Sequence, residues 1–266
     1  MELLSDKQHK LRQILRENAP LLIAYSGGVD SAYLLAEARG ILGKDGMLGV
    51  IADSPSLPRK ALASALHLAE SLDAPVEVVS TGELDNADYA QNPVNRCYFC
   101  KAELFAKLEE IAGQRMFRAL AYGENADDMK QVRPGRGAAS EFSVLAPLRD
   151  AGLGKGEIRT ASRALGLPTA DAPAQPCLSS RIPHGTPVTR DALAMVEAGE
   201  EWVRNLGFSV FRVRYLAQSQ TDTAPGARVQ IAPSEMGRLA EVRTQLEGGL
   251  LAVGYGRIEI DPQGYR

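Results

Sequence analysis

The sequence is poor in cysteine, in long apolar runs and in net charge. It has three cysteines among 266 residues, and an odd number cannot form a fully paired disulfide framework. No stretch approaches the roughly 18 apolar residues that a membrane helix needs. The first residues also lack the charged-then-apolar pattern of a signal peptide. We therefore expect a cytoplasmic protein with no membrane partner.

The balance of charge argues against a protein that binds a long polyanion. Thirty basic and 33 acidic residues give a formal net charge of −3, so a nucleic-acid partner is not expected. A content of 45% hydrophobic and 24% charged residues is ordinary for a globular protein. At about 150 residues per domain, the length favours two domains.

A glycine-rich segment at 26–31 is the most informative part of the chain. It lies between an apolar run at 21–25 and a helical pattern at 32–38, and no Gly-Lys-Ser/Thr follows, which excludes a Walker loop. Glycines in a strand-to-helix turn let backbone N–H groups approach an anion, and the helix N-terminus adds partial positive charge. The Ser26 and Ser31 hydroxyls add donors, and Asp30 is placed to hold Mg²⁺. The segment therefore predicts a nucleotide phosphate site.

Apolar runs at 21–25, 47–52, 76–79 and 117–122 alternate with helical patterns. This alternation predicts the α/β class, with a parallel sheet and helices on both faces. The carboxyl ends of parallel strands share one edge, where ligands bind. The candidate ATP-binding residues at that edge are Ser26, Gly27, Gly28, Asp30, Ser31, Ser54 and Gly123.

The last third of the chain has a different pattern. We place a domain boundary at 172/173, which gives an ATP-binding domain at 1–172 and a smaller α+β domain at 173–266. Helices are expected at 191–206 and 234–247 and strands at 210–215, 227–231 and 250–260. A loop is expected at 130–137, where the chain is basic and rich in glycine.

The three cysteines lie outside the apolar strands. Cys97 and Cys100 form a CxxC, and Cys177 lies far downstream. Three thiolates suit a [4Fe–4S] cluster with one open iron, and CxxC spacing also suits a Cys₃His zinc site with His184. Three other interpretations remain: the CxxC is a redox motif, the cysteines pack in the core, or Cys177 acts alone as a sulfur donor.

Several segments together resemble the LarE family, the PP-loop sulfur insertases of nickel-pincer cofactor synthesis. The matching segments are 25–31, 96–101, 123–128, 133–135, 146–148, 177–186, 212–214 and 264–266, and they cover nearly the whole chain. The PP-loop alone is shared with many enzymes, whereas the block around Cys177 is specific.

The resemblance implies a PP-loop ATP pyrophosphatase fold, with ATP and Mg²⁺ as cofactors and Asp30 as a Mg²⁺ ligand. It implies adenylation of pyridinium-3,5-biscarboxylic acid mononucleotide, followed by sulfur insertion. Having all three cysteines implies the cluster-dependent type, with Cys97, Cys100 and Cys177 holding [4Fe–4S] and sulfide or another sulfur donor as co-substrate. Sacrificial use of Cys177 is the alternative, and a homo-oligomer is expected.

Three arginines are candidates for the substrate phosphate, because guanidinium groups bind phosphate oxygens through paired hydrogen bonds: Arg181, Arg212 and Arg214. Arg212 and Arg214 share one face of a predicted strand, and a solvated face with surface ion pairs is the other interpretation. Gln230 stands where the family usually has a carboxylate, which puts a metal role of this domain in doubt.

Other functions remain open from the sequence alone. A cluster-dependent tRNA thiolase also combines a PP-loop with three cysteines, although the net charge and the block around Cys177 argue against it. An amidating PP-loop enzyme is a second alternative, but it would not need clustered cysteines. A protein that only senses ATP is a third, and a test for pyrophosphate would distinguish it, because it would release none.

Overall fold

A computed structural model describes residues 3–130, 134–218 and 224–265. Residues 131–133 of the predicted loop at 130–137, and Arg266 of the segment at 264–266, lie outside the described residues. Within those ranges, no helix combines the length and the apolar character that crossing a bilayer requires.

The chain divides into two units, each built from several segments. The first comprises residues 1–54, 59–83 and 95–175, and the second comprises 55–58, 84–94 and 176–266. The break at 175/176 lies close to the boundary placed at 172/173. Nothing in the sequence pattern pointed to the two short segments, 55–58 and 84–94, that group with the second unit.

The first unit is built on a parallel sheet with the strand order β3-β2-β1-β4. Its strands are β1 (Leu21–Ala24), β2 (Met47–Asp53), β3 (Val76–Ser80) and β4 (Ala119–Tyr122). The central strand β1 has three successive buried residues, as expected where both faces of a sheet are covered. The parallel sheet confirms the predicted α/β fold.

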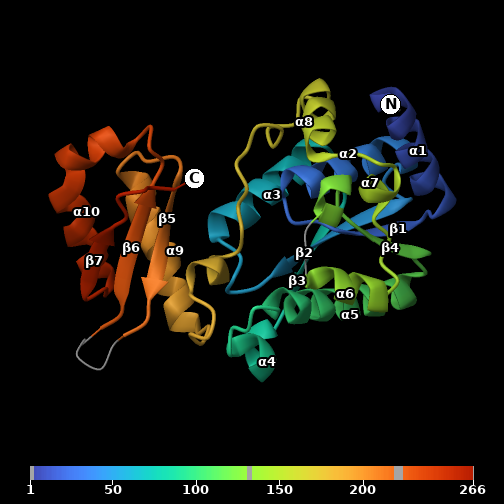
Figure 1. Cartoon of the computed structure of the whole chain (residues 1–266). Helices are drawn as coiled ribbons and strands as arrows, with labels where there is room; N and C mark the ends of the chain where they lie inside the picture. The colour runs from blue at the N-terminus through green and yellow to red at the C-terminus, as the bar shows by residue number, and fades with distance from the viewer. Residues whose placement is uncertain (1–2, 131–133, 219–223, 266) are drawn as a thin grey trace. The chain divides into compact units, whose positions relative to one another are not determined.

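Helices cover both faces of this sheet. The helices of the first unit are α1 (Leu4–Glu17), α2 (Val29–Leu42), α3 (Arg59–Ser71), α5 (Arg96–Arg115), α6 (Gly135–Glu141), α7 (Pro147–Asp150) and α8 (Lys155–Ala164), with 3₁₀ turns η1 (Glu83–Asp85, which continues into the second unit) and η2 (Ala126–Lys130). Figure 1 shows α1, α2 and α8 on one face and α5 and α6 on the other. The chain moves across the sheet in one direction from β1 to β2 and then to β3, and it moves back in the other direction from β3 to β4. Because crossovers between parallel strands are right-handed, connections that run in opposite directions place their helices on opposite faces of the sheet. Gly135 begins a helix inside the segment where a loop was expected.

The second unit is an α+β unit, as expected. Its elements are α4 (Ala87–Ala90), η3 (Leu178–Arg181), α9 (Arg190–Asn205), β5 (Phe211–Leu216), β6 (Gly226–Ile231), η4 (Met236–Arg238), α10 (Leu239–Val253) and β7 (Arg257–Ile260). Strand β6 pairs antiparallel with β5 and parallel with β7. Its core includes Val203, Phe211, Val229 and Leu250.

The strand expected at 250–260 is wrong over its first half. Helix α10 continues to Val253, and only residues 257–260 form a strand. The helix ends at Gly254, which has φ +115° and donates to the carbonyl of Leu250. Gly249 lies inside this helix, at a position where a Cβ would lie 1.9 Å from the Trp202 ring, so the packing requires glycine there.

Candidate active site

The loop after β1 is shaped by its glycines. Gly27 has φ +73°, and a Cβ on it would lie 2.6 Å from the Cβ of Ala65 on α3. Ser26 and Gly28 are exposed, and Gly28 is the N-cap of α2. The loop therefore presents backbone N–H groups to solvent at a helix N-terminus, which is the geometry that binds phosphate.

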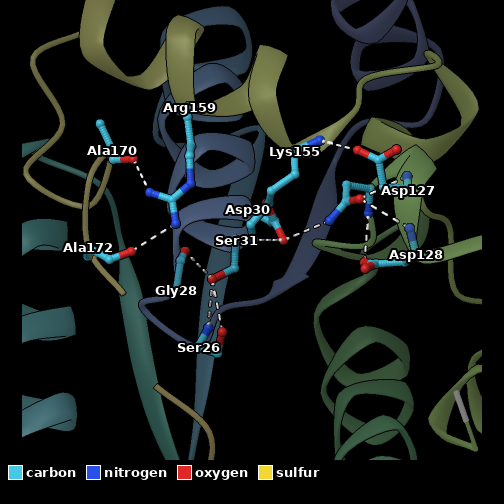
Figure 2. Close-up of polar contacts among 11 residues, drawn as sticks. Ser26, Gly28, Asp30, Ser31, Asp127, Asp128, Lys155, Arg159, Ala170 and Ala172 are labelled. Atoms are coloured by element: carbon cyan, nitrogen blue, oxygen red, sulfur yellow. Dashed lines mark hydrogen bonds and ion pairs between the residues drawn. The ribbon is translucent and has the colours of Figure 1, made fainter. Parts of the chain in front are cut away.

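The hydroxyl of Ser31 fixes the conformation of this loop. Its Oγ accepts from the backbone N–H of Ser26 at 3.2 Å and donates to the carbonyl of Gly28 at 3.1 Å. The Ser26 Oγ lies 3.0 Å from the same atom, as Figure 2 shows. Since Ser31 is buried, it organises the loop, and Ser26 is the more accessible of the two hydroxyls.

The end of β4 lies directly against the start of α2. A Cβ on Gly123 would lie 2.7 Å from the backbone nitrogen of Ser31 and 3.0 Å from the carbonyl carbon of Asp30. Only glycine fits this approach. Gly123 therefore acts through its small size, which lets the residues after β4 reach Asp30.

Asp30 is the centre of a polar network from three segments (Figure 2). Its Oδ2 accepts from the Nζ of Lys155, at 2.7 Å, and from the Nδ2 of Asn125, at 3.1 Å. Among the described residues, its buried Oδ1 has no hydrogen-bond partner. A buried carboxylate oxygen without a donor is suited to a cation such as Mg²⁺.

Asp127 and Asp128 have local roles. The Oδ2 of Asp127 accepts from the backbone N–H of Lys155 at the start of α8, and its Oδ1 accepts from Lys130. The hydrogen bond from Lys130 holds the pKa of Asp127 below its ordinary value, helped by the bond from the Lys155 backbone. Asp128 accepts from the backbone N–H of Asn125. From sequence, these carboxylates are expected either to contact a metal or the arginine-rich loop, or to cap the next segment, and capping and turn formation match this geometry.

A buried carboxylate organises the arginines after β4. Glu124 is 4% exposed and accepts from Arg136 at 3.0 Å and from Arg149 at 2.8 Å. Burial favours its neutral form, but the hydrogen bonds from Arg136 and Arg149, together with the charge of Arg136, outweigh burial and lower the pKa of Glu124. Its charge thus fixes two cations in the segment that follows the sheet edge.

Ser54 follows β2 at the same edge of the sheet and is buried. Its carbonyl accepts from Arg59, which also pairs with Asp53 at 2.6 Å. The predicted ATP-binding residues of the first unit are thus brought to one edge by the parallel register of β1, β2 and β4.

The three cysteines divide between the units. Cys97 and Cys100 lie in the first turn of α5 in the first unit, and Cys177 precedes η3 in the second. None is in a disulfide. Residues three apart share a helix face, and a helix N-terminus favours thiolates. His184 is exposed, and its Nδ1 lies 3.3 Å from the carbonyl oxygen of Asn92. As they stand, the described residues contain no group of three or more His, Cys, Asp or Glu side chains placed to bind a metal ion.

Arg181 is held by protein groups around Cys177. Its guanidinium pairs with Glu200 of α9 through two bonds of 2.8 and 2.9 Å. It also donates to the carbonyls of Pro176 and Cys177. The side chains of Arg181 and Glu200 are 4% and 7% exposed. A phosphate on Arg181 would compete with these partners, and phosphate binding here stays a prediction.

Arg212 and Arg214 lie on one face of β5 and are half-buried. Burial lowers the pKa of the Arg212 guanidinium, and the charge of Arg181 adds to that effect. Arg214 donates to the carbonyl of Ser180 and to the Oε1 of Gln230. Because Gln230 is neutral, it orients Arg214 without cancelling its charge, which favours an anion at this face.

Three residues of these networks were missed from sequence. Lys155 carried no signal beyond a helix start, and the pairing of Arg149 with Glu124 joins residues 25 apart. Glu200 did carry a signal, since it continues the buried stripe of α9 formed by Leu193, Val196 and Val203. A charged residue in an apolar helical stripe indicates a buried partner.

No family model matches the chain. The chain is 36% identical over 266 residues to an uncharacterized protein, slr1717, of Synechocystis, covering 99% of this chain and 96% of that protein. It is 29% identical over 266 residues to the pyridinium-3,5-bisthiocarboxylic acid mononucleotide synthase of Lactiplantibacillus plantarum, covering 100% and 94%. An uncharacterized protein of Methanocaldococcus jannaschii, MJ0830, is 28% identical over 211 residues, covering 77% and 79%.

Proposed function

This chain belongs to the LarE family, and from that premise we propose that it is an ATP-dependent sulfur transferase acting on a pyridinium dicarboxylate mononucleotide. The observation that carries the proposal is the similarity, over the full chain, to a synthase of the bisthiocarboxylic acid mononucleotide. The open loop at the N-terminus of α2 supports the ATP-dependent part.

In the first step, a substrate carboxylate oxygen attacks the α-phosphorus of ATP, and the bond to the bridging oxygen breaks to release pyrophosphate. The loop at 26–31 would hold the departing phosphates through its N–H groups. Mg²⁺ on the Oδ1 of Asp30 and the ammonium of Lys155 would offset their charge. Lys155 is the residue that the geometry adds to those expected from sequence.

In the second step, a sulfur nucleophile attacks the acyl carbon of the adenylate, and the bond from that carbon to the AMP oxygen breaks. AMP leaves and a thiocarboxylate remains, and a second round treats the other carboxylate. Arg212 and Arg214 would bind the substrate phosphate at the positively charged face of β5.

The thiols at Cys97, Cys100 and Cys177 have the donor chemistry for a [4Fe–4S] cluster, and none is in a disulfide. Such a cluster, when bound, would supply the sulfide. In the alternative, the Cys177 thiolate attacks the acyl adenylate and AMP leaves, which forms a thioester. Removal of the Cα proton of Cys177 then breaks its Cβ–S bond, so the sulfur stays on the substrate as a thiocarboxylate and Cys177 is left as dehydroalanine.

One anaerobic experiment tests these steps. The purified chain is reconstituted with iron and sulfide, then given ATP, Mg²⁺ and the dicarboxylate mononucleotide, and pyrophosphate, AMP and thiocarboxylate are measured. About four irons per chain, lost in Cys97→Ala, are expected for the cluster. A Cys177 lighter by the elements of hydrogen sulfide after one turnover would identify the sacrificial route. No release of pyrophosphate would refute the proposal.

The arginine assignment has its own control. Arg214→Ala is expected to raise the KM for the mononucleotide at least tenfold without changing the KM for ATP, because a charge-assisted bond to phosphate is lost. Arg228→Ala removes an arginine from the neighbouring strand that pairs with Glu259 at 3.0 Å, and it should leave both values unchanged. Equal effects of the two variants would contradict the assignment.

A further inference from the structure

Three buried hydroxyls of the second unit form a closed ring of hydrogen bonds. The Oγ of Ser56 lies 2.7 Å from the Oη of Tyr89 and 2.8 Å from the Oγ of Ser179. Tyr89 and Ser179 are 2.7 Å apart. Each hydroxyl can donate one bond and accept one within the ring, so all three bonds can exist at once and strengthen one another.

This ring joins three segments that are far apart in the sequence. Ser56 comes from 55–58, Tyr89 from 84–94 and Ser179 from the segment that carries Cys177. The backbone N–H of Leu178 also donates to the carbonyl of Ser56 at 2.8 Å. The 55–58 segment continues directly from Ser54 at the end of β2.

The Cys177 backbone is therefore held from both sides. Arg181 holds the carbonyls of Pro176 and Cys177, and the ring, together with the Ser56 carbonyl, holds the residues that follow. A thiol that must meet an acyl adenylate gains from such fixed placement, because a misplacement of about 1 Å can cost about 10²-fold in rate.

We propose that Ser56, Tyr89 and Ser179 are positioning residues that hold Cys177 for sulfur delivery. The proposal rests on the proposed function. A positioning role affects sulfur transfer and leaves adenylation intact, so the adenylate formed in a loosened variant is hydrolysed. Loss of folded protein would instead reduce both reactions equally.

Tyr89→Phe removes one ring hydroxyl with little change of shape, and Ser179→Ala removes a second. Tyr255→Phe is the matched control: its hydroxyl is also buried in the second unit but has no hydrogen-bond partner among the described residues. The test measures thiocarboxylate formed per pyrophosphate released, and hydrogen exchange at the Leu178 amide.

We expect Tyr89→Phe and Ser179→Ala to lower the product ratio about fivefold and to speed exchange at Leu178 about fivefold, as for one lost hydrogen bond. Tyr255→Phe should change neither. An unchanged ratio in both ring variants, or equal exchange in Tyr89→Phe and Tyr255→Phe, would overturn the proposal. If the wild-type chain forms no thiocarboxylate, the proposed function fails and the role in sulfur delivery fails with it. The exchange rates still decide whether the ring holds the segment.

Discussion

Replacing Glu200 with glutamine is expected to destabilise the second unit strongly. The side chains of Arg181 and Glu200 are 4% and 7% exposed, so the guanidinium would be left buried without a counter-charge. Removing one partner of a buried ion pair costs about 3–5 kcal/mol. With a urea m-value of about 2 kcal/mol per M, the unfolding midpoint should fall by about 1.5–2.5 M.

The chain contains one tryptophan, Trp202, and it lies on α9, the helix that also carries Glu200. Its fluorescence therefore reports unfolding of the second unit. Glu247→Gln is the matched control, because Glu247 pairs with Arg243 on the surface of α10, where the side chains are 36% and 64% exposed. Exposed pairs of this kind contribute about 0.3–0.5 kcal/mol. Equal midpoints for the two variants would refute the reasoning.

Three further predictions concern the first unit. Lys155→Met should lower the rate of pyrophosphate release about 10²-fold, because the phosphates lose one donor to their developing charge. Lys130→Met should leave that rate unchanged, and an assay of released pyrophosphate measures both variants. Gly27→Ala should lower the free energy of unfolding, measured by urea denaturation, by about 1–3 kcal/mol more than Gly43→Ala does. Both glycines have a positive φ, but only at Gly27 would an added Cβ meet a close neighbour, Ala65. The lowered pKa of Glu124 should stabilise the fold above pH 4.5, with that contribution lost as pH falls through the lowered value. When the free energy of unfolding is measured as the pH is lowered, Glu124→Gln should lack this part of the decline. The same dependence on pH in the variant and the wild-type chain would contradict the assignment.

The fold and the glycine-rich loop at 26–31 could be predicted from sequence because their causes are local. Alternating apolar runs determine the strands, and a strand-to-helix turn with a positive φ requires glycine at position 27. The parallel register then brings the strand ends together without further information.

The networks around the loop could not be predicted in the same way. The pair of Lys155 with Asp30 joins residues 125 apart, and no local pattern encodes such a distance. The prediction of a strand over the end of α10 was wrong for a different reason. A short apolar run beside glycines fits a strand or a buried helix equally well. Leu246 and Leu250, which are four residues apart, are both buried in the core of the second unit, as the helical period requires.

The order of segments in the second unit bears on how the chain folds during synthesis. The chain passes between the units at 54/55, 58/59, 83/84, 94/95 and 175/176. Ser56 and Tyr89 therefore leave the ribosome well before the segment with which they pair. The ring can therefore close only after Ser179 has been made. A fragment that starts at Pro176 would lack both hydroxyls, so the second unit is not a transferable module. Its completion depends on the first unit having been made.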